Sequence, residues 1–120
     1  HKNMENKNCI FCKIAKKQIK AGLIEETNNF IAFLDANPRA KGHTLVIPKK
    51  HYVTILDIPN TLGEEMLKLI KKIASRILEK KQGDGFNLIM NNLPPAGQFV
   101  MHAHVHIIPR KEKDGLRMIS

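Results

Sequence analysis

The decapeptide at residues 101–110, Met-His-Ala-His-Val-His-Ile-Ile-Pro-Arg, alternates imidazole and apolar side chains. Successive side chains of a strand point to opposite faces of a sheet, so this alternation predicts a strand over residues 100–108 that ends at Pro109. One face would carry His102, His104 and His106, and the other would carry Ala103, Val105 and Ile107. The outer two imidazole-bearing α-carbons would lie about 13 Å apart. The three rings therefore cannot form one compact ligand cluster without residues from elsewhere.

The strongest pattern preceding this strand is helical. Apolar residues recur at spacings of three and four between Leu62 and Lys81, which predicts an amphipathic helix over 62–81. Thr61 and Glu64 fit a capping box at its start, and Gly83 is a plausible stop after its end.

The remaining elements are shorter. Alternating or apolar runs bounded by turn residues predict strands over 23–26, 30–35, 43–48 and 86–90, and residues 9–17 predict a short helix or turn. Strands, one long helix and further strands in this order indicate an α+β domain with a mainly antiparallel sheet. We assign residues 9–120 to a single domain. The polar residues 1–8 are expected to be disordered, with His1 before Met4 typical of a tag remnant.

The composition and net charge limit the classes of partner that this protein is expected to bind. The 120 residues carry a formal net charge of +9, which suits anionic ligands such as nucleotides. The lysines are scattered, and one Tyr and no Trp offer no platform for stacking single strands, so a nucleic-acid partner is not expected. No apolar run approaches the roughly 20 residues that span a bilayer. No secretory signal is evident, so we expect a cytoplasmic protein without a membrane partner.

Two chemical interpretations of the histidine strand remain open from the residues alone. In the first, the neutral ring of His104 is a nucleophile, and a flanking histidine stabilises the developing oxyanion. In the second, His104 and His106 join a third ligand on zinc. Nearby glycine and amide side chains, Gly97, Gln98 and Asn91, favour the first because they suit a bound phosphate.

Cys9 and Cys12 have the C-x-x-C spacing of a zinc half-site. Free buried thiols and a redox pair are the alternatives. Thioredoxin-like chemistry would place the pair at a helix start after a strand, and no strand is predicted before Cys9.

The residues 102–108 resemble the signature of the histidine-triad family, in which apolar residues separate three histidines. Further stretches are similar to segments of that family in the same order: residues 9–14, 33–38, 42–51, Asn91 and 96–98. The resemblance covers residues 9–110. It is nearest to the Hint-like nucleoside phosphoramidases in their bacterial, zinc-bearing form.

This resemblance implies a five-stranded sheet with one long and one short helix, and a homodimer that joins two such sheets into ten strands. It implies cleavage of a purine nucleoside monophosphate, or a derivative of it, from a phosphoramidate or related leaving group. His104 would form a nucleotidyl-histidine intermediate, His106 would hold the phosphate, and His43 would support the triad. No catalytic cofactor is implied.

The resemblance also implies the nucleotide contacts. Asp35 would bind the ribose hydroxyls, and Asn91 and Gln98 would contact the phosphate. The base pocket would be lined by apolar side chains, namely Ile19, Phe33, Leu34 and Ala36. The site would extend along the segment Gly97, Gln98, Phe99 and Val100. A structural zinc would be held by Cys9, Cys12, His51 and His102.

One residue departs from the family pattern. The position after Gln98 is usually small and polar in the family, whereas this chain has Phe99. We therefore expect Phe99 to weaken catalysis or to shift the leaving-group preference. A nucleotide- or RNA-binding adaptor with little turnover is the alternative function, motivated by Phe99 and the basic surface. A catalytic zinc hydrolase is a third.

Overall fold

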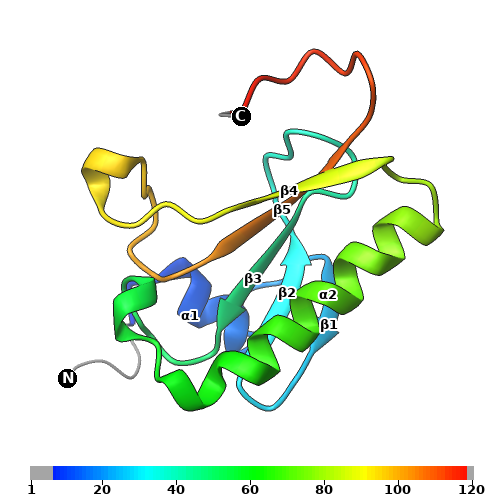
Figure 1. Cartoon of the computed structure of the whole chain (residues 1–120). Helices are drawn as coiled ribbons and strands as arrows, with labels where there is room; N and C mark the ends of the chain where they lie inside the picture. The colour runs from blue at the N-terminus through cyan, green and yellow to red at the C-terminus, as the bar shows by residue number, and fades with distance from the viewer. Residues whose placement is uncertain (1–6, 119–120) are drawn as a thin grey trace.

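The computed structural model describes residues 7–118, so residues 1–6 of the predicted disordered segment lie outside the described part of the chain. Its helices and strands run in the order α1 (Ile10–Ala15), β1 (Leu23–Glu26), β2 (Phe30–Leu34), β3 (Thr44–Pro48), α2 (Gly63–Glu79), β4 (Gly85–Ile89) and β5 (Val105–Arg110). The five strands form one sheet in the order β1-β2-β3-β5-β4, and every neighbouring pair is antiparallel (Figure 1). The predicted fold class is therefore confirmed.

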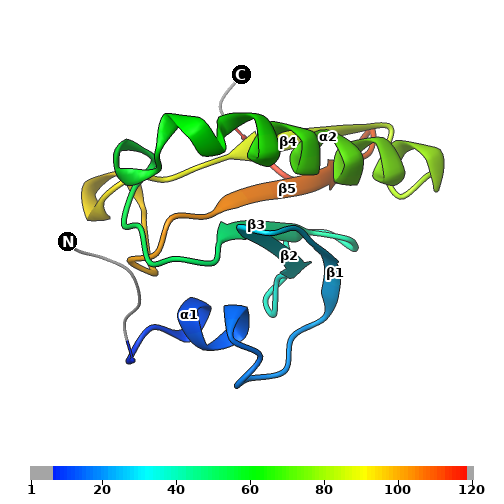
Figure 2. The ribbon, with the colours of Figure 1, turned by 90° about the horizontal axis from the view of Figure 1, so that it is seen from below.

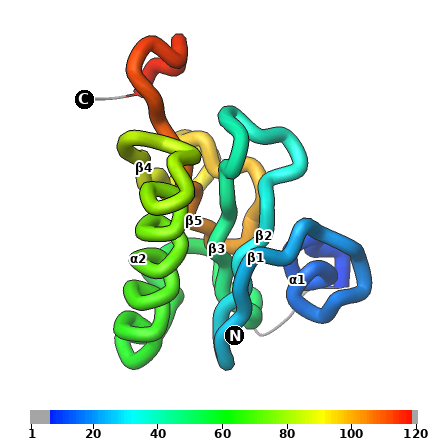
Figure 3. Tube along the Cα trace, turned by 90° about the vertical axis from the view of Figure 1, so that its right-hand side faces the viewer, coloured from blue at the N-terminus to red at the C-terminus, as the bar shows by residue number. Residues whose placement is uncertain are grey.

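The sheet lies between the two α-helices, with α2 on one face and α1 on the other (Figures 2 and 3). Between α2 and the sheet, Ile70 and Ile73 pack in one cluster with Phe30, Val46 and Ile107. The α1 face of β2 and β3 packs against Phe11 and Ile14 in a second cluster. Because β2 and β3 are covered on both faces, their sequences are continuously apolar rather than alternating.

β5 begins later and ends later than the prediction of 100–108. Its pairing with β3 reaches only from Ile107 to Val105, because β3 ends at Pro48, which has no N–H to continue the ladder. Pro109 does not end the strand and pairs with Phe86 of β4. Pro109 is tolerated within the strand because neighbouring residues of a strand direct their backbone groups to opposite sides. The carbonyl oxygen of Arg110 accepts a hydrogen bond from the N–H of Asp84 on the β4 side. The missing N–H of Pro109 thus faces the other side, where β3 has already diverged.

Both predicted ends of the long helix are wrong in detail. A 3₁₀ turn over Asn60–Leu62 leads into α2, so Thr61 is not the N-cap and no side chain caps the helix there. At the other end, Lys81 and not Gly83 takes the left-handed conformation, with φ of 58°. Gly83 is needed for a different reason, because a Cβ there would lie 2.8 Å from the carbonyl oxygen of Gly85.

β4 lies at the edge of the sheet, so one side of its backbone has no partner strand within residues 7–118. Phe86 and Leu88 pair with Pro109 and Ile107, and all four residues face the α2 side of the sheet. Leu88 remains 50% exposed there. Among residues 7–118, no helix has the length and apolar character required to cross a bilayer.

Candidate active site

The alternation of the histidine segment persists although His102 and His104 precede β5. His104 and His106 face the α1 side of the sheet, opposite Val105 and Ile107, which pack against α2. The rings of His104 and His106 lie 5.1 Å apart, and Phe11 of α1 stacks edge-on against His104 at 5.1 Å. Helix α1 thus positions the central ring from one side, and His106 from the other.

A hydrogen bond sets the tautomer of His104. Its Nδ1 lies 2.7 Å from the backbone carbonyl oxygen of His102, which can only accept a hydrogen bond. Nδ1 therefore carries the proton, and Nε2 of the neutral ring keeps its lone pair. The atom that could attack phosphorus is thus Nε2.

A second chain of hydrogen bonds sets the tautomers of His43 and His106. The backbone N–H of Arg39 donates to Nδ1 of His43 at 3.0 Å, which places the ring proton of neutral His43 on Nε2. That Nε2 lies 3.0 Å from Nδ1 of His106, so it donates there and leaves the proton of His106 on its own Nε2. His106 therefore presents an N–H donor, next to the lone pair of His104.

Burial keeps the rings of His43 and His106 neutral. It lowers the pKa of His106 to about 4, and the neighbouring rings of His104 and His43 act in the same direction. Burial also lowers the pKa of His43, against the opposing effect of Asp35, whose Oδ2 lies 3.4 Å from His43 Nε2. At neutral pH both rings therefore act through hydrogen bonds rather than as cations.

A hollow of about 230 Å³ opens in front of these rings. We call it the histidine hollow, and its lining residues are Asp35, Asn37, Arg39, His43, Ile89, Asn91, His106, Ile108 and Met118. Four predicted site residues thus meet there: Asp35, His43, Asn91 and His106. His104 does not line it and is 5% exposed, lying behind His106 against Phe11.

Gln98 is buried, and backbone partners occupy its side-chain amide. Oε1 accepts from the N–H of Leu93 at 2.6 Å, and Nε2 donates to the carbonyl oxygens of Val53 and Val100. In this arrangement Gln98 ties the loop before the histidines to the segment after β3. The phosphate contact expected of it remains a prediction.

The other expected nucleotide contacts are dispersed. Phe33 is buried in the core under α1, Ile19, Leu34 and Ala36 are exposed, and none of these four lines the histidine hollow. Val100 packs at the edge of the same core cluster. Gly97 takes a φ of 93° at the end of a 3₁₀ turn, Pro94–Ala96, and Phe99 beyond it is 97% exposed.

Sequence reasoning missed two contributors to the histidine arrangement. The backbone N–H of Arg39 fixes the tautomer of His43, and Phe11 packs against both His102 and His104. A backbone donor has no signature in the sequence. Phe11 lies between the two cysteines, where its contact with residues more than ninety positions away has no local signal.

The four residues expected to bind zinc converge at the other end of the histidine segment. Sγ of Cys9 and Sγ of Cys12 lie 3.3 Å and 3.5 Å from Nδ1 of His102, and Sγ of Cys12 lies 3.3 Å from Nδ1 of His51. All four ligand atoms lie within 4.8 Å of one another. Tetrahedral zinc with ordinary bond lengths separates sulfur and nitrogen ligands by about 3.6 Å, so the cluster fits the ion.

The histidine rings of this cluster also have the protonation state that metal binding requires. Nε2 of His102 donates to the carbonyl oxygen of Pro48 at 2.8 Å, so its Nδ1 lone pair faces the thiols. Burial lowers the pKa of His102 to about 4 and lowers the pKa of His51, which favours the neutral form that binds metals.

A second group, Asp35, His43 and His106, also has ligand atoms within 4.8 Å of one another. Its hydrogen bonds favour a different role, because the proton on Nε2 of His43 occupies the position where a metal would bind. Within residues 7–118, no such group contains both His104 and His106, the pair expected under the catalytic-zinc alternative.

Comparison with protein families matches residues 16–113 of this chain to the HIT domain model. The chain is 49% identical over 107 residues to a HIT-like protein of Methanocaldococcus jannaschii, covering 89% of this chain and 82% of that protein. It is 43% identical over 109 residues to adenosine 5'-monophosphoramidase HNT1 of Saccharomyces cerevisiae, and 40% identical over 108 residues to adenylylsulfatase HINT3 of Arabidopsis thaliana. Each match covers 90% of this chain, but only 66% of the yeast protein and 55% of the plant protein.

Two solved structures show the same fold. A protein from Streptococcus mutans superimposes with a TM-score of 0.90 at 38% identity, covering 98% of this chain and 75% of that one. A zinc-bound histidine-triad family protein from Mycobacterium smegmatis superimposes with a TM-score of 0.86 at 38% identity, covering 92% and 81%.

Proposed function

Because this chain belongs to the HIT domain family, we propose that it is a nucleotide hydrolase in which His104 attacks phosphorus. The observation that carries the proposal is the bond from Nδ1 of His104 to the carbonyl oxygen of His102, which leaves Nε2 as a free nucleophile. The substrate would be a purine nucleoside monophosphate joined to a leaving group. Relatives named for cleaving a phosphoramidate and an adenylyl sulfate support that class.

In the proposed reaction, Nε2 of His104 forms a bond to phosphorus as the bond from phosphorus to the leaving group breaks. The Nε2–H of His106 lies on the ring beside His104, and it would bind a phosphate oxygen and supply a proton to the leaving group. Water then attacks phosphorus and gives a proton back to Nε2 of His106, and the bond from phosphorus to His104 breaks to restore the free ring. His43 acts through His106 by holding its tautomer.

Access to His104 is the step that this proposal requires. His106 lines the histidine hollow and His104 lies just behind it, so a phosphate must enter past His106 from the side of Asp35 and Asn91. Asp35 on this rim would accept hydrogen bonds from the ribose hydroxyls. The resemblance to the family implies a homodimer with a ten-stranded sheet, and pairing of the two β4 edge strands would form it.

The test measures hydrolysis of adenosine 5'-phosphoramidate and adenosine 5'-phosphosulfate by wild type, His104→Ala and the control Met101→Ala. Met101 lies in the same segment but is exposed, so its variant should retain activity. We expect His104→Ala to lose at least about a thousandfold in kcat. Rapid quenching with labelled substrate should trap a nucleotidyl adduct on His104. Binding without turnover by the wild type would instead favour the adaptor function.

Phe99 is tested in the same assay. Its side chain is 97% exposed, so it packs against almost nothing within residues 7–118. We expect Phe99→Ser to raise kcat or to change the ratio of rates for the two leaving groups. Unchanged kinetics on both substrates would reject a role for Phe99.

We further propose that Cys9, Cys12, His51 and His102 hold a structural zinc. The ion would fix the position of His102, whose carbonyl oxygen accepts the hydrogen bond from Nδ1 of His104. Wild type grown with ample zinc should carry about one equivalent, and Cys12→Ser should lose it together with at least about 5 °C in Tm. Less than about 0.3 equivalents in the wild type would count against the site. Activity that survives a weak chelator would exclude a catalytic zinc.

A further inference from the structure

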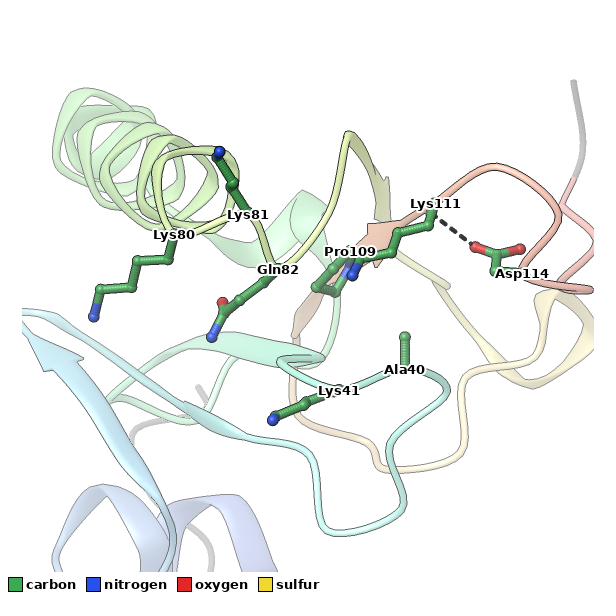
Figure 4. A pocket seen from close by; sticks show the side chains of 8 residues that line it. All are labelled: Ala40, Lys41, Lys80, Lys81, Gln82, Pro109, Lys111 and Asp114. Carbon is green, nitrogen blue, oxygen red and sulfur yellow. Dashed lines mark hydrogen bonds between the residues drawn. The ribbon is translucent and has the colours of Figure 1, made fainter.

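A second hollow, of about 570 Å³, lies where the loop before β3, the end of α2 and the end of β5 meet (Figure 4). We call it the lysine hollow, and its lining residues are Ala40, Lys41, Lys80, Lys81, Gln82, Pro109, Lys111 and Asp114. Four of these eight residues are lysines. They come from three segments that are distant in the sequence.

The positive charge of this hollow is not compensated from within the described chain. None of the four lysines forms an ion pair with a carboxylate within residues 7–118, whereas Lys17, Lys49, Lys68 and Lys72 all do. The one acidic lining residue, Asp114, is already bound by the guanidinium of Arg110 at 2.7 Å and 2.9 Å. A concave surface with charges of one sign concentrates the electric field and attracts counterions.

The end of α2 does not account for these lysines. The last carbonyl groups of the helix are bonded by backbone N–H groups, including Gln82 to Ile77 and Lys81 to Leu78. The ammonium groups are therefore not required as caps. In Figure 4, the ends of Lys41, Lys80 and Lys111 surround the Gln82 amide, while Lys81 is directed away from it.

The backbone brings one wall of this hollow close to the others at Gly42. Gly42 has a φ of 91°, and a Cβ there would come within 3.2 Å of Oε1 of Gln82 and 3.3 Å of Cγ of Pro109. A side chain at residue 42 would therefore have a strained backbone and would press on both Gln82 and Pro109. Pro109 points to the α2 face, whereas His106 and Ile108 point to the histidine hollow, so the two hollows open on opposite faces of β5.

We propose that the lysine hollow binds an oligophosphate, a compact chain of three or four phosphate groups, separately from the histidine hollow. Its volume is in the range of small-molecule sites. Lysines from three different segments on one hollow match a short multivalent anion, with the Gln82 amide as an additional donor. The lining contains no aromatic ring on which a base could stack, which favours phosphate groups alone over a nucleic acid.

The test is a calorimetric titration with inorganic triphosphate at low salt. The wild type is compared with Lys41→Gln/Lys80→Gln/Lys111→Gln and with the control Lys13→Gln/Lys20→Gln/Lys71→Gln. Both triple variants lose three positive charges, but the control lysines do not line the hollow. We expect the first variant to raise Kd at least about tenfold and the control to raise it less than about twofold.

Amide NMR spectra locate the ligand, and the largest shifts should occur at Lys41, Gln82 and Lys111. Shifts confined to the histidine hollow would overturn the proposal, as would no binding or an equal loss of affinity in both triple variants. A single-stranded oligonucleotide serves as the alternative probe. Tighter binding of this probe, with the same dependence on Lys41, Lys80 and Lys111, would replace the oligophosphate by a nucleic-acid backbone. None of these readouts depends on the proposed hydrolysis.

Discussion

At the scale of single residues, the hydrogen bonds of Gln98 give it a structural role that differs from the phosphate contact implied by the family resemblance. Its amide bonds Leu93, which has a φ of 76° that is costly for a branched side chain, and it also reaches Val53. We expect Gln98→Ala to lower the free energy of unfolding by about 1 to 2 kcal/mol, because the N–H of Leu93 and the carbonyl oxygens of Val53 and Val100 lose their side-chain partner. Urea denaturation measures this change.

Asn91→Ala is the matched control in the same loop, because within residues 7–118 its side chain makes a single long hydrogen bond, of 3.4 Å, to the carbonyl oxygen of Gly97. It should cost less than about 0.5 kcal/mol. If Gln98→Ala keeps wild-type stability and only raises KM, Gln98 serves the phosphate and does not brace the loop.

Also at this scale, His106 predicts a pH dependence of stability. Its pKa is about 4 in the folded protein against a reference value of 6.5, so between these values the unfolded chain binds more protons. The contribution of neutral His106 is therefore complete above pH 6.5 and is lost as pH falls toward 4. It amounts to at most about 3 kcal/mol. The groups that face this ring are His104, His43, Asp35 and Arg39.

Urea denaturation between pH 7 and pH 4.5 measures this loss, and His106→Gln should show a shallower slope than the wild type. The proposed zinc ligands are unchanged in His106→Gln, so an acid-induced loss of a bound metal would cancel in the comparison. Glu26, with a pKa of about 2, titrates below this range. Parallel slopes for the two proteins would show that His106 is not held neutral by the fold.

At the scale of elements, the end of α2 predicts a stabilising substitution. Lys81 has a φ of 58°, a left-handed conformation that costs a non-glycine residue roughly 1 kcal/mol. Lys81→Gly should therefore raise the free energy of unfolding by about that amount. Lys80→Gly is the control, because φ at Lys80 is −87° and glycine there only adds freedom to the unfolded chain. A gain from Lys80→Gly, or a loss from Lys81→Gly, would contradict this explanation.

The same elements show what the sequence could predict. The apolar periodicity placed α2 and all five strands, because burial against a sheet requires that pattern. The ends were misplaced where a competing interaction takes over. A 3₁₀ turn replaces the expected cap at Thr61, and the ring of His102 takes the carbonyl of Pro48 where a strand partner was expected.

The candidate site was predictable to the same degree. Alternation correctly placed His104 and His106 on the face opposite Val105, because a period of two is a property of the backbone. The tautomers were not predictable, because they depend on backbone atoms of Arg39 and His102 that only the folded loops bring to the rings. The lysine hollow was equally hidden, since its charges come from segments that are far apart in the sequence.

At the scale of the whole molecule, the open edge of β4 predicts self-association. An edge strand exposes unpaired backbone groups, and Phe86 and Leu88 beside it leave apolar surface exposed on the α2 face. A second copy that pairs its own β4 antiparallel to this edge would satisfy the backbone and cover both side chains. We therefore expect a homodimer in solution, and we expect Leu88→Lys to convert it to a monomer because two lysines would be buried across the new interface.

Sedimentation equilibrium of wild type and Leu88→Lys measures the mass directly. Leu56→Lys is the matched control, since Leu56 is 87% exposed but lies in a 3₁₀ turn away from β4. It should leave the dimer intact. A monomeric wild type would contradict the predicted homodimer, and a dimer that survives Leu88→Lys would place the interface elsewhere than on this edge. The free row of β4 N–H and C=O groups would then have to be protected from aggregation within the single chain, by the twist of the strand or by water.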